Sequence, residues 1–134
     1  MAVTEWLRAR HNRAFFSLAL GGLGLVAIGC GSGASQPADP TLARQVLVEV
    51  LDSWKKGDPP DASLHRSPPV RVTDEEWVAG ARLLDYRVEA DGRDIVGEQS
   101  FPLTLTLENK GRKLTRKVED HVVTDPTLAV FRQE

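Results

Sequence analysis

A change in the spacing of apolar residues near position 81 is the feature that most constrains the fold of this chain. Before it, apolar residues recur every three or four positions, as on one face of an α-helix: Ala43, Val46, Leu47, Val50, Leu51 and Trp54. After it, apolar residues alternate with polar ones, which is typical of β-strands with one buried face. The sequence therefore predicts an α+β domain with a helix first and a sheet after it.

The predicted N-terminal amphipathic helix covers residues 40–56. Asp39 supplies an N-cap, Pro40 suits the first helical position, and Gly57 suits a left-handed C-cap. The Asp-Pro-Pro sequence at 58–60 then prevents the helix from continuing. This helix is the best-defined element in the sequence.

Two weaker patterns follow the helix. Residues 58–70 contain four prolines and no periodicity, which indicates a loop. Residues 73–76 (Thr-Asp-Glu-Glu) have the spacing of a capping box, so a short second helix that ends near Gly80 is expected.

The alternating segments predict a four-strand antiparallel meander packed on the first helix. Turn residues at 90–92 and 109–111 separate the first three strands. Pro102 indicates a sheet edge or a bulge, because proline has no N–H to donate to a neighbouring strand. The expected strands cover residues 84–88, 101–107, 113–124 and 127–132.

The N-terminal segment has the layout of a secretory signal peptide. Residues 1–13 carry three arginines and one glutamate, and residues 14–29 carry no charge. Sixteen residues make about 24 Å of helix, less than the roughly 30 Å hydrocarbon core of a bilayer. A cleaved signal is therefore expected rather than a membrane span.

Residues 26–30 (Val-Ala-Ile-Gly-Cys) resemble the lipobox of bacterial lipoproteins, in which a small residue precedes a cysteine that becomes the lipid-modified N-terminus. The resemblance implies cleavage between Gly29 and Cys30 and a lipid on Cys30, although Ala27 stands where the family usually has leucine. The lone cysteine fits this role, because it can form no disulfide within the chain. The alternative is a plain secreted protein that is cut near Ala34.

This interpretation divides the chain into a signal peptide (1–29), a lipidated cysteine with a flexible tether (30–39) and a single small domain (40–134). The lipid would hold the protein at a bacterial membrane, facing the periplasm. Gly31 follows the cysteine where aspartate would favour the inner membrane, so the outer membrane is expected. Loss of the signal leaves a net charge near −4, which gives no electrostatic case for nucleic-acid binding.

Residues 52–58 (Asp-Ser-Trp-Lys-Lys-Gly-Asp) close the helix ahead of the sheet, and this order resembles the NTF2-like and cystatin-like α+β families. A typical NTF2-like protein has three helices and a longer sheet. The resemblance implies a cone-shaped pocket that some members use for ligands and others fill with side chains. Residues 124–132 resemble the tail of uncharacterised small lipoproteins, which implies no activity.

The candidate pocket residues are the aromatic side chains and one histidine: Trp54, Trp77, Tyr86 and His121. The alternative interpretation places the aromatic side chains in the core. Asp120 and His121 are adjacent on a strand and point to opposite faces, so they form no acid–base pair. His121 is expected to be a structural or surface residue, and the alternative is a contact with Tyr86 or Asp85 across the sheet.

Metal and cofactor sites are not predicted. Only His65, in the proline-rich loop, and His121 remain after processing, and the sequence has no metal-ligand motif. It also has no nucleophile elbow and no phosphate-binding loop. No catalytic residues are therefore assigned.

Cations gather around the hairpin turn at 109–111: Lys110, Arg112, Lys113, Arg116 and Lys117. They suit contact with anionic lipid headgroups or an acidic partner. Alternatively, they keep an exposed hairpin soluble and unpaired.

Together these features suggest a non-catalytic, lipid-anchored module that binds or organises another component of the cell envelope. One alternative is a small NTF2-like ligand-binding protein or enzyme that uses the cone-shaped pocket. Another is a structural lipoprotein whose basic hairpin touches the membrane.

Overall fold

Helix α1 (Pro40–Lys56) starts and ends where its capping residues indicate. The chain is described by a computed structural model, which covers residues 37–133. The side chain of Asp39 accepts hydrogen bonds from the N–H groups of Thr41 and Leu42, at 2.9 and 3.1 Å. Gly57 adopts a φ of 91° and closes the helix with bonds to the carbonyls of Ser53 and Trp54.

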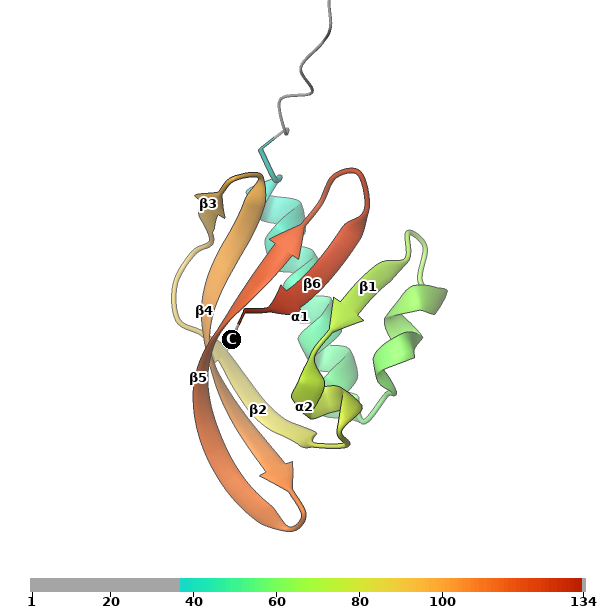
Figure 1. Cartoon of the computed structure of the whole chain (residues 1–134), viewed down its shortest axis with the longest axis vertical. Helices are drawn as coiled ribbons and strands as arrows, with labels where there is room; N and C mark the ends of the chain where they lie inside the picture. Colours follow the sequence, from blue (N-terminus) through green and yellow to red (C-terminus); the bar gives the residue numbers. More distant parts are fainter. Residues whose placement is uncertain (1–36, 134) are drawn as a thin grey trace, which may run out of the picture. The chain divides into compact units, whose positions relative to one another are not determined.

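The sheet has six strands and is mixed, so the predicted four-strand antiparallel meander is wrong in strand number and in direction. The α+β class itself is confirmed (Figure 1). The strands lie in the order β1-β6-β5-β4-β2, and β3 pairs with β4 beside β2. Their bounds are β1 Val70–Thr73, β2 Arg82–Val88, β3 Arg93–Ile95, β4 Glu98–Asn109, β5 Arg112–Val123 and β6 Leu128–Arg132.

Strand β1 pairs in parallel with β6, and the sequence pattern did not reveal it. It is only four residues long and follows the proline-rich segment that was predicted to be a loop through residue 70. That segment also contains a short 3-10 helix, η1 (Pro60–His65). Pairing between Val70 and Leu128 joins residues far apart in sequence, so it leaves no local signal.

The short second helix is confirmed as α2 (Glu75–Val78). Its N-cap is Asp74, whose side chain accepts a hydrogen bond from the N–H of Trp77 at 3.1 Å. Thr73, the expected first residue of the capping box, belongs to β1 instead.

The connection between β2 and β4 contains a strand that the sequence pattern missed. The segment at 90–92 was expected to be a hairpin turn, but the chain continues into β3 and turns at Val96 and Gly97. Val96 has a φ of 50°, which β-branched residues rarely adopt, so a hairpin turn was not indicated there.

Pro102 lies where the pairing of β4 with β2 and β3 is interrupted. The β2 pairing ends at Val88 opposite Leu103, and the β3 pairing begins at Arg93 opposite Ser100. Pro102 therefore sits in a gap between β2 and β3, where its missing N–H leaves no strand partner unsatisfied.

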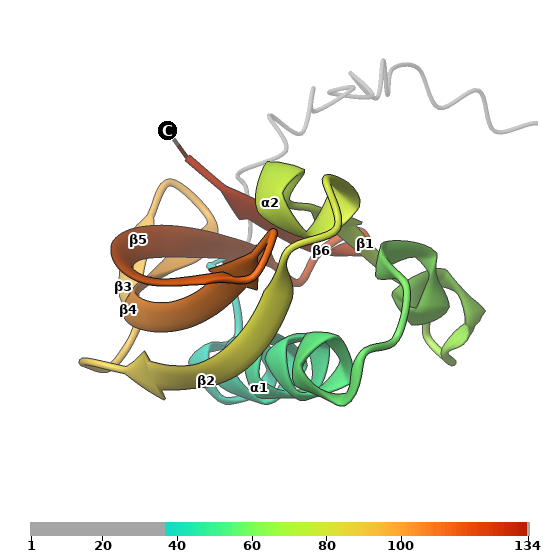
Figure 2. The same ribbon diagram turned by 90° about the horizontal axis from the view of Figure 1, so that it is seen from below.

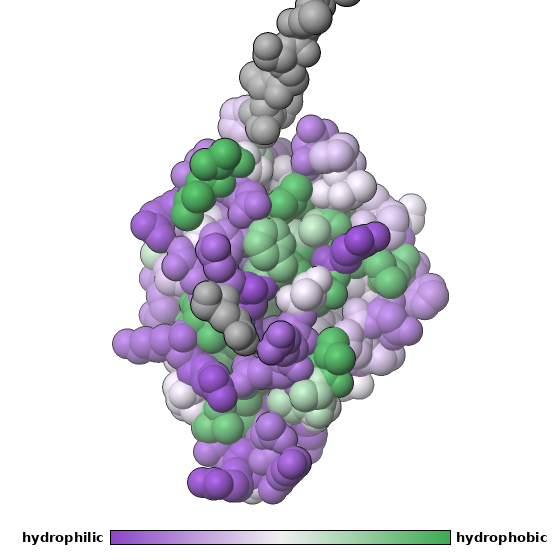
Figure 3. All heavy atoms as spheres, viewed as in Figure 1, coloured by the Kyte–Doolittle hydropathy of each residue, from purple (hydrophilic) through white to green (hydrophobic). Residues whose placement is uncertain are grey.

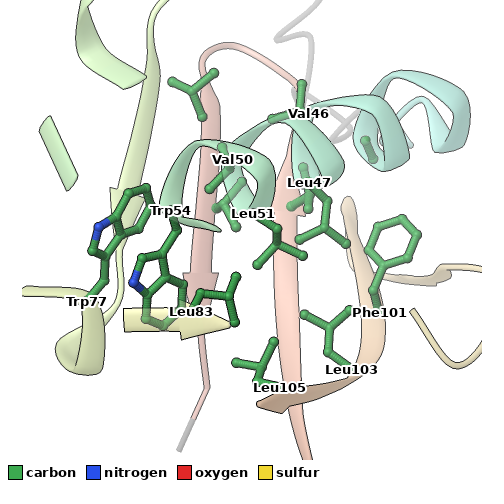
Figure 4. Close-up of a cluster of buried hydrophobic side chains, with 14 of the residues drawn as sticks. Val46, Leu47, Val50, Leu51, Trp54, Trp77, Leu83, Phe101, Leu103 and Leu105 are labelled. Carbon is green, nitrogen blue, oxygen red and sulfur yellow. The ribbon is translucent and has the colours of Figure 1, made fainter. Parts of the chain in front are cut away.

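The apolar stripe of α1 packs on one face of the sheet and forms the core (Figure 4). A bulge between Leu83 and Asp85 shifts the alternation of β2, so Leu83 and Tyr86 face the same side. From the sheet, the buried side chains that meet α1 are Leu83, Phe101, Leu103, Leu105, Leu107, Val122 and Val130. Figure 2 shows the strong curvature of β2, β4 and β5 beside α1.

Residues 37–133 belong to one compact unit. The predicted signal peptide, the cleavage site at Gly29 and Cys30, and most of the tether lie outside the described residues. Within residues 37–133, no helix combines the length and the apolarity that a membrane span requires.

Candidate functional site

Strand β5 has two halves with different neighbours. Its whole length, Arg112–Val123, pairs with β4 on one side. On the other side, β6 pairs only with the last four residues, Asp120–Val123. Between Arg112 and Glu119, none of the strands in the described part of the chain pairs with this second side.

The backbone groups that point to the open side can be identified from the register. The N–H of Glu89 donates to the carbonyl of Pro102 at 2.9 Å, so Pro102 directs its backbone toward β2. Leu103 and every second residue of β4 therefore bond to β5, because backbone direction alternates along a strand. On β5, the N–H and C=O groups that face the open side belong to Lys113, Thr115, Lys117 and Glu119.

The side chains along this open edge also alternate. Leu114 and Val118 lie on the face that packs against the core, where both are partly buried. Lys113 and Lys117 lie on the opposite face and are exposed. Arg116 lies between these two side chains on the core face, where it pairs with Glu76, and Thr115 lies between the two lysines on the other face. The edge therefore offers two aliphatic side chains on one face and two lysines on the other.

An open groove of about 1290 Å³ runs over this edge. Four consecutive residues of β5, 116–119, line it. Consecutive strand residues point to opposite faces, so a groove lined by all four must cross the strand edge. Its other side is formed by α2 and by the end of β6, through Glu76 and Arg132.

A cluster of buried charges, centred on Arg132, closes one end of the groove. Its Nε donates to Oδ1 of Asp120 at 2.9 Å, and its Nη1 donates to Oε2 of Glu76 at 3.2 Å. Its Nη2 lies 2.7 Å from Oδ2 of Asp74, an ion pair without hydrogen-bond geometry. Arg116 adds a second cation, with its Nε 2.8 Å from Oε1 of Glu76.

Asp120 is the least exposed carboxylate of this cluster, at 3% of its surface. Burial raises the pKa of Asp120 above its usual range, because a charged carboxylate loses its hydration there. The guanidinium of Arg132 opposes this shift. The cluster therefore joins β6 to β5 and α2 through charged groups that contact one another in place of water.

The structure brings two of the four predicted pocket residues together. Trp54 and Trp77 stack with ring centroids 5.3 Å apart, and both are buried. The indole N–H of Trp54 donates to the carbonyl of Ala81 at 2.8 Å, and that of Trp77 donates to the carbonyl of Asp58 at 3.0 Å. Both also line a groove of about 350 Å³ at the end of α1.

Tyr86 and His121 lie apart from that pair and from each other. The hydroxyl of Tyr86 donates to Oδ1 of Asp52 on α1 at 2.7 Å, and burial raises the pKa of Tyr86 to about 12. His121 is on the opposite face, stacked on Phe131 at 5.4 Å, with its Nδ1 3.2 Å from Oε2 of Glu98.

The alternative cross-sheet partners of His121, Tyr86 and Asp85, are therefore wrong. Asp85 instead pairs with Lys55, at 3.2 Å, and this contact lowers the pKa of Asp85. Asp120 and His121 do point to opposite faces, with separate partners. His65, at the end of η1, is exposed.

The five predicted cations occupy different environments. Lys110 and Arg112 are exposed at the β4–β5 turn, and Lys113 and Lys117 follow on one face of β5. Arg116 alone of the five forms an ion pair with a carboxylate in the described part of the chain. Figure 3 shows hydrophilic side chains over this end of the domain.

The Arg132 cluster was missed because its members lie on three separate elements. Asp74, Asp120 and Arg132 show no common spacing in the sequence. Across residues 37–133, no group of three histidine, cysteine or acidic side chains is arranged to hold a metal ion. A scan against protein-family models and a search of curated proteins found no match for this chain.

Proposed function

We propose that this chain is a lipid-anchored protein of the bacterial cell envelope whose folded domain is a non-catalytic binding module. One observation carries the proposal: the uncharged run of residues 14–29 ends directly at Cys30, the only cysteine. The arginines that precede this run, and the small residue Gly29, complete the arrangement of a lipoprotein export signal.

The start of the folded domain supports an anchor close by. Ala38 is buried at 3% exposure, and the N–H of Asp39 donates to the hydroxyl of Thr124 at 3.2 Å. Seven residues separate Cys30 from Ala38, which span about 25 Å at most when extended. A lipid on Cys30 would thus hold the domain near the membrane.

The separation between the start of the domain and the β4–β5 turn supports a contact away from that membrane. The chain enters beside the β5–β6 connection, whereas the β4–β5 turn lies at the opposite end (Figure 1). Strand β4 has twelve residues, which correspond to about 40 Å along the sheet. A domain that stands upright on the membrane would carry Lys110 and Arg112 away from its own lipid, where another envelope component could reach them.

The chemistry of the groove supports binding rather than catalysis. A general acid or base must exchange a proton with a substrate. Asp120, the described carboxylate with a raised pKa, is buried and bonded to Arg132. Glu89 and Glu119, whose pKa values are lowered, are bonded to Arg87 and to Ser100 respectively. These carboxylates already have partners within the protein.

Intact-mass analysis of the protein from a bacterial membrane fraction tests the proposal. We expect the loss of residues 1–29 and the addition of a diacylglyceryl group, usually with a further acyl chain. A Cys30→Ser variant is the matched control, and it should lack the lipid and leave the membrane fraction. Full-length protein without lipid, recovered from the cytosol, would contradict the proposal.

A further inference from the structure

The open edge of β5 differs from the two outer edges of the sheet, beside which helical segments make contacts. Segment η1 packs beside β1. On β2, Lys55 of α1 pairs with Asp85 at 3.2 Å, and Asp52 of α1 accepts a hydrogen bond from Tyr86 on the inner face. Sheet proteins commonly cover or charge their edges to prevent unwanted pairing. The 112–119 stretch of β5 is charged, and its residues 116–119 line an open groove.

We propose that this edge binds an extended peptide segment of a partner protein, which adds a strand to the sheet in line with β6. The segment would carry apolar side chains alternating with acidic ones. This deepens the proposed function and rests on its binding role, since it names the partner of the module.

The backbone provides the first part of the recognition. Four residues of β5, from Lys113 to Glu119, direct their N–H and C=O groups to the open side. A partner strand would continue the pairing that β6 makes up to Asp120. Main-chain hydrogen bonds of this kind give affinity without regard to sequence.

The side chains provide the selectivity. On the core face, Leu114 and Val118 are partly buried on either side of Arg116, whose charge Glu76 already pairs. Apolar neighbours would complete the burial of the two aliphatic side chains. On the other face, Lys113 and Lys117 would each lie opposite one residue of the partner, with Thr115 between them, and each lysine favours Asp or Glu opposite it. Because side chains alternate between the two faces of a strand, the partner segment would alternate apolar and acidic side chains.

Charge also disfavours pairing of this edge with a second copy of the chain in one two-fold register. In a two-fold antiparallel pairing centred on Thr115, Lys113 of one copy would face Lys117 of the other. Like charges directly opposite each other destabilise a strand pair. An acidic partner removes this repulsion and neutralises both lysines.

Peptide binding to the full chain, purified in detergent, tests the inference. The probe is a fluorescent octapeptide that alternates valine with glutamate, and its counterpart has lysine in place of glutamate. We expect about tenfold tighter binding of the acidic peptide by fluorescence anisotropy. Slower amide exchange at Lys113, Thr115 and Lys117 should accompany binding, with no change at Tyr86 on the β2 edge.

Two variants separate backbone recognition from charge. Thr115→Pro removes an N–H that faces the open side and should abolish binding, while circular dichroism checks the fold. The Lys113→Glu/Lys117→Glu double variant keeps every backbone group and should reverse the preference between the peptides. Lys56→Glu/Arg71→Glu makes the same charge change elsewhere on exposed residues and should preserve it.

Equal binding of both peptides, or protection confined to another edge, would overturn the inference. So would binding to phosphatidylglycerol vesicles that the double charge variant abolishes and Thr115→Pro leaves intact, because that pattern indicates lipid contact. Self-association abolished by Thr115→Pro would also overturn it in favour of a second copy. The mass of the membrane-extracted protein tests the lipid anchor separately, so either proposal can fail alone.

Discussion

The two halves of β5 belong to one strand but contribute differently to this protein. Residues 120–123 are paired on both sides and include the buried side chains of Asp120, His121 and Val122. Residues 112–119 are paired on one side, and their cationic side chains are exposed. Both halves form strand. The position of each half relative to β6 and α2 decides whether it stabilises the fold or exposes a binding surface.

The largest expected effect comes from removing the cation that holds the buried half together. Arg132→Met should lower the free energy of unfolding by about 3–5 kcal/mol, because Asp120 and Asp74 stay buried without it. Urea unfolding at neutral pH measures this change. Arg112→Met in the exposed half is the control and should stay within about 0.5 kcal/mol. Equal losses in both variants would remove the distinction between the halves.

Apolar burial should separate the halves in the same way. Val122 is fully buried, so Val122→Ala should lower the free energy of unfolding by about 2 kcal/mol through lost contacts and a cavity. Thr115→Ala, a matched truncation at an exposed site of the same strand, should change it by less than about 0.5 kcal/mol. Chemical denaturation of both variants compares the two losses, and a Thr115 loss as large as that of Val122 would contradict this picture.

A smaller effect tests the hydrogen bond that joins α1 to β2. Tyr86→Phe removes the hydrogen bond to Asp52 and should lower the free energy of unfolding by about 1 kcal/mol. The folded pKa is raised from 10.0 to about 12, so this stabilisation is complete below pH 10 and disappears as pH rises through 12. Tyr86 is the only tyrosine, so tyrosinate absorbance reports it alone. Titration near 10 in the folded protein would refute the contact.

The weakest effect is a pH dependence of the buried half. Burial raises the pKa of Asp120 above 3.8, so its contribution to stability is complete below pH 3.8 and decreases as pH rises through the folded pKa. Relative to Asp120→Asn, the protein should therefore lose stability from acidic toward neutral pH. Parallel denaturation series at several pH values measure the difference, and a difference that grows in favour of Asp120 would reverse the sign.

The sequence predicts part of the candidate site at the β4–β5 hairpin. The turn at Lys110 and Gly111 was expected from Asn-Lys-Gly, and both residues adopt positive φ. The cations around it were also identified. The sequence could not reveal that β6 ends opposite Asp120 and leaves the remainder of β5 open on one side. No local sequence pattern predicts which distant strands pair.

The sequence by itself determined the elements whose causes lie within a few residues. Helix α1 follows from its apolar stripe and its caps, α2 from the polar residues before Trp77, and the α+β class from the change in periodicity. Only the tertiary structure decided the parallel pairing of β1 with β6, the Arg132 cluster and the open edge of β5. Each depends on contacts between residues distant in sequence, where burial and charge pairing across elements outweigh local propensity.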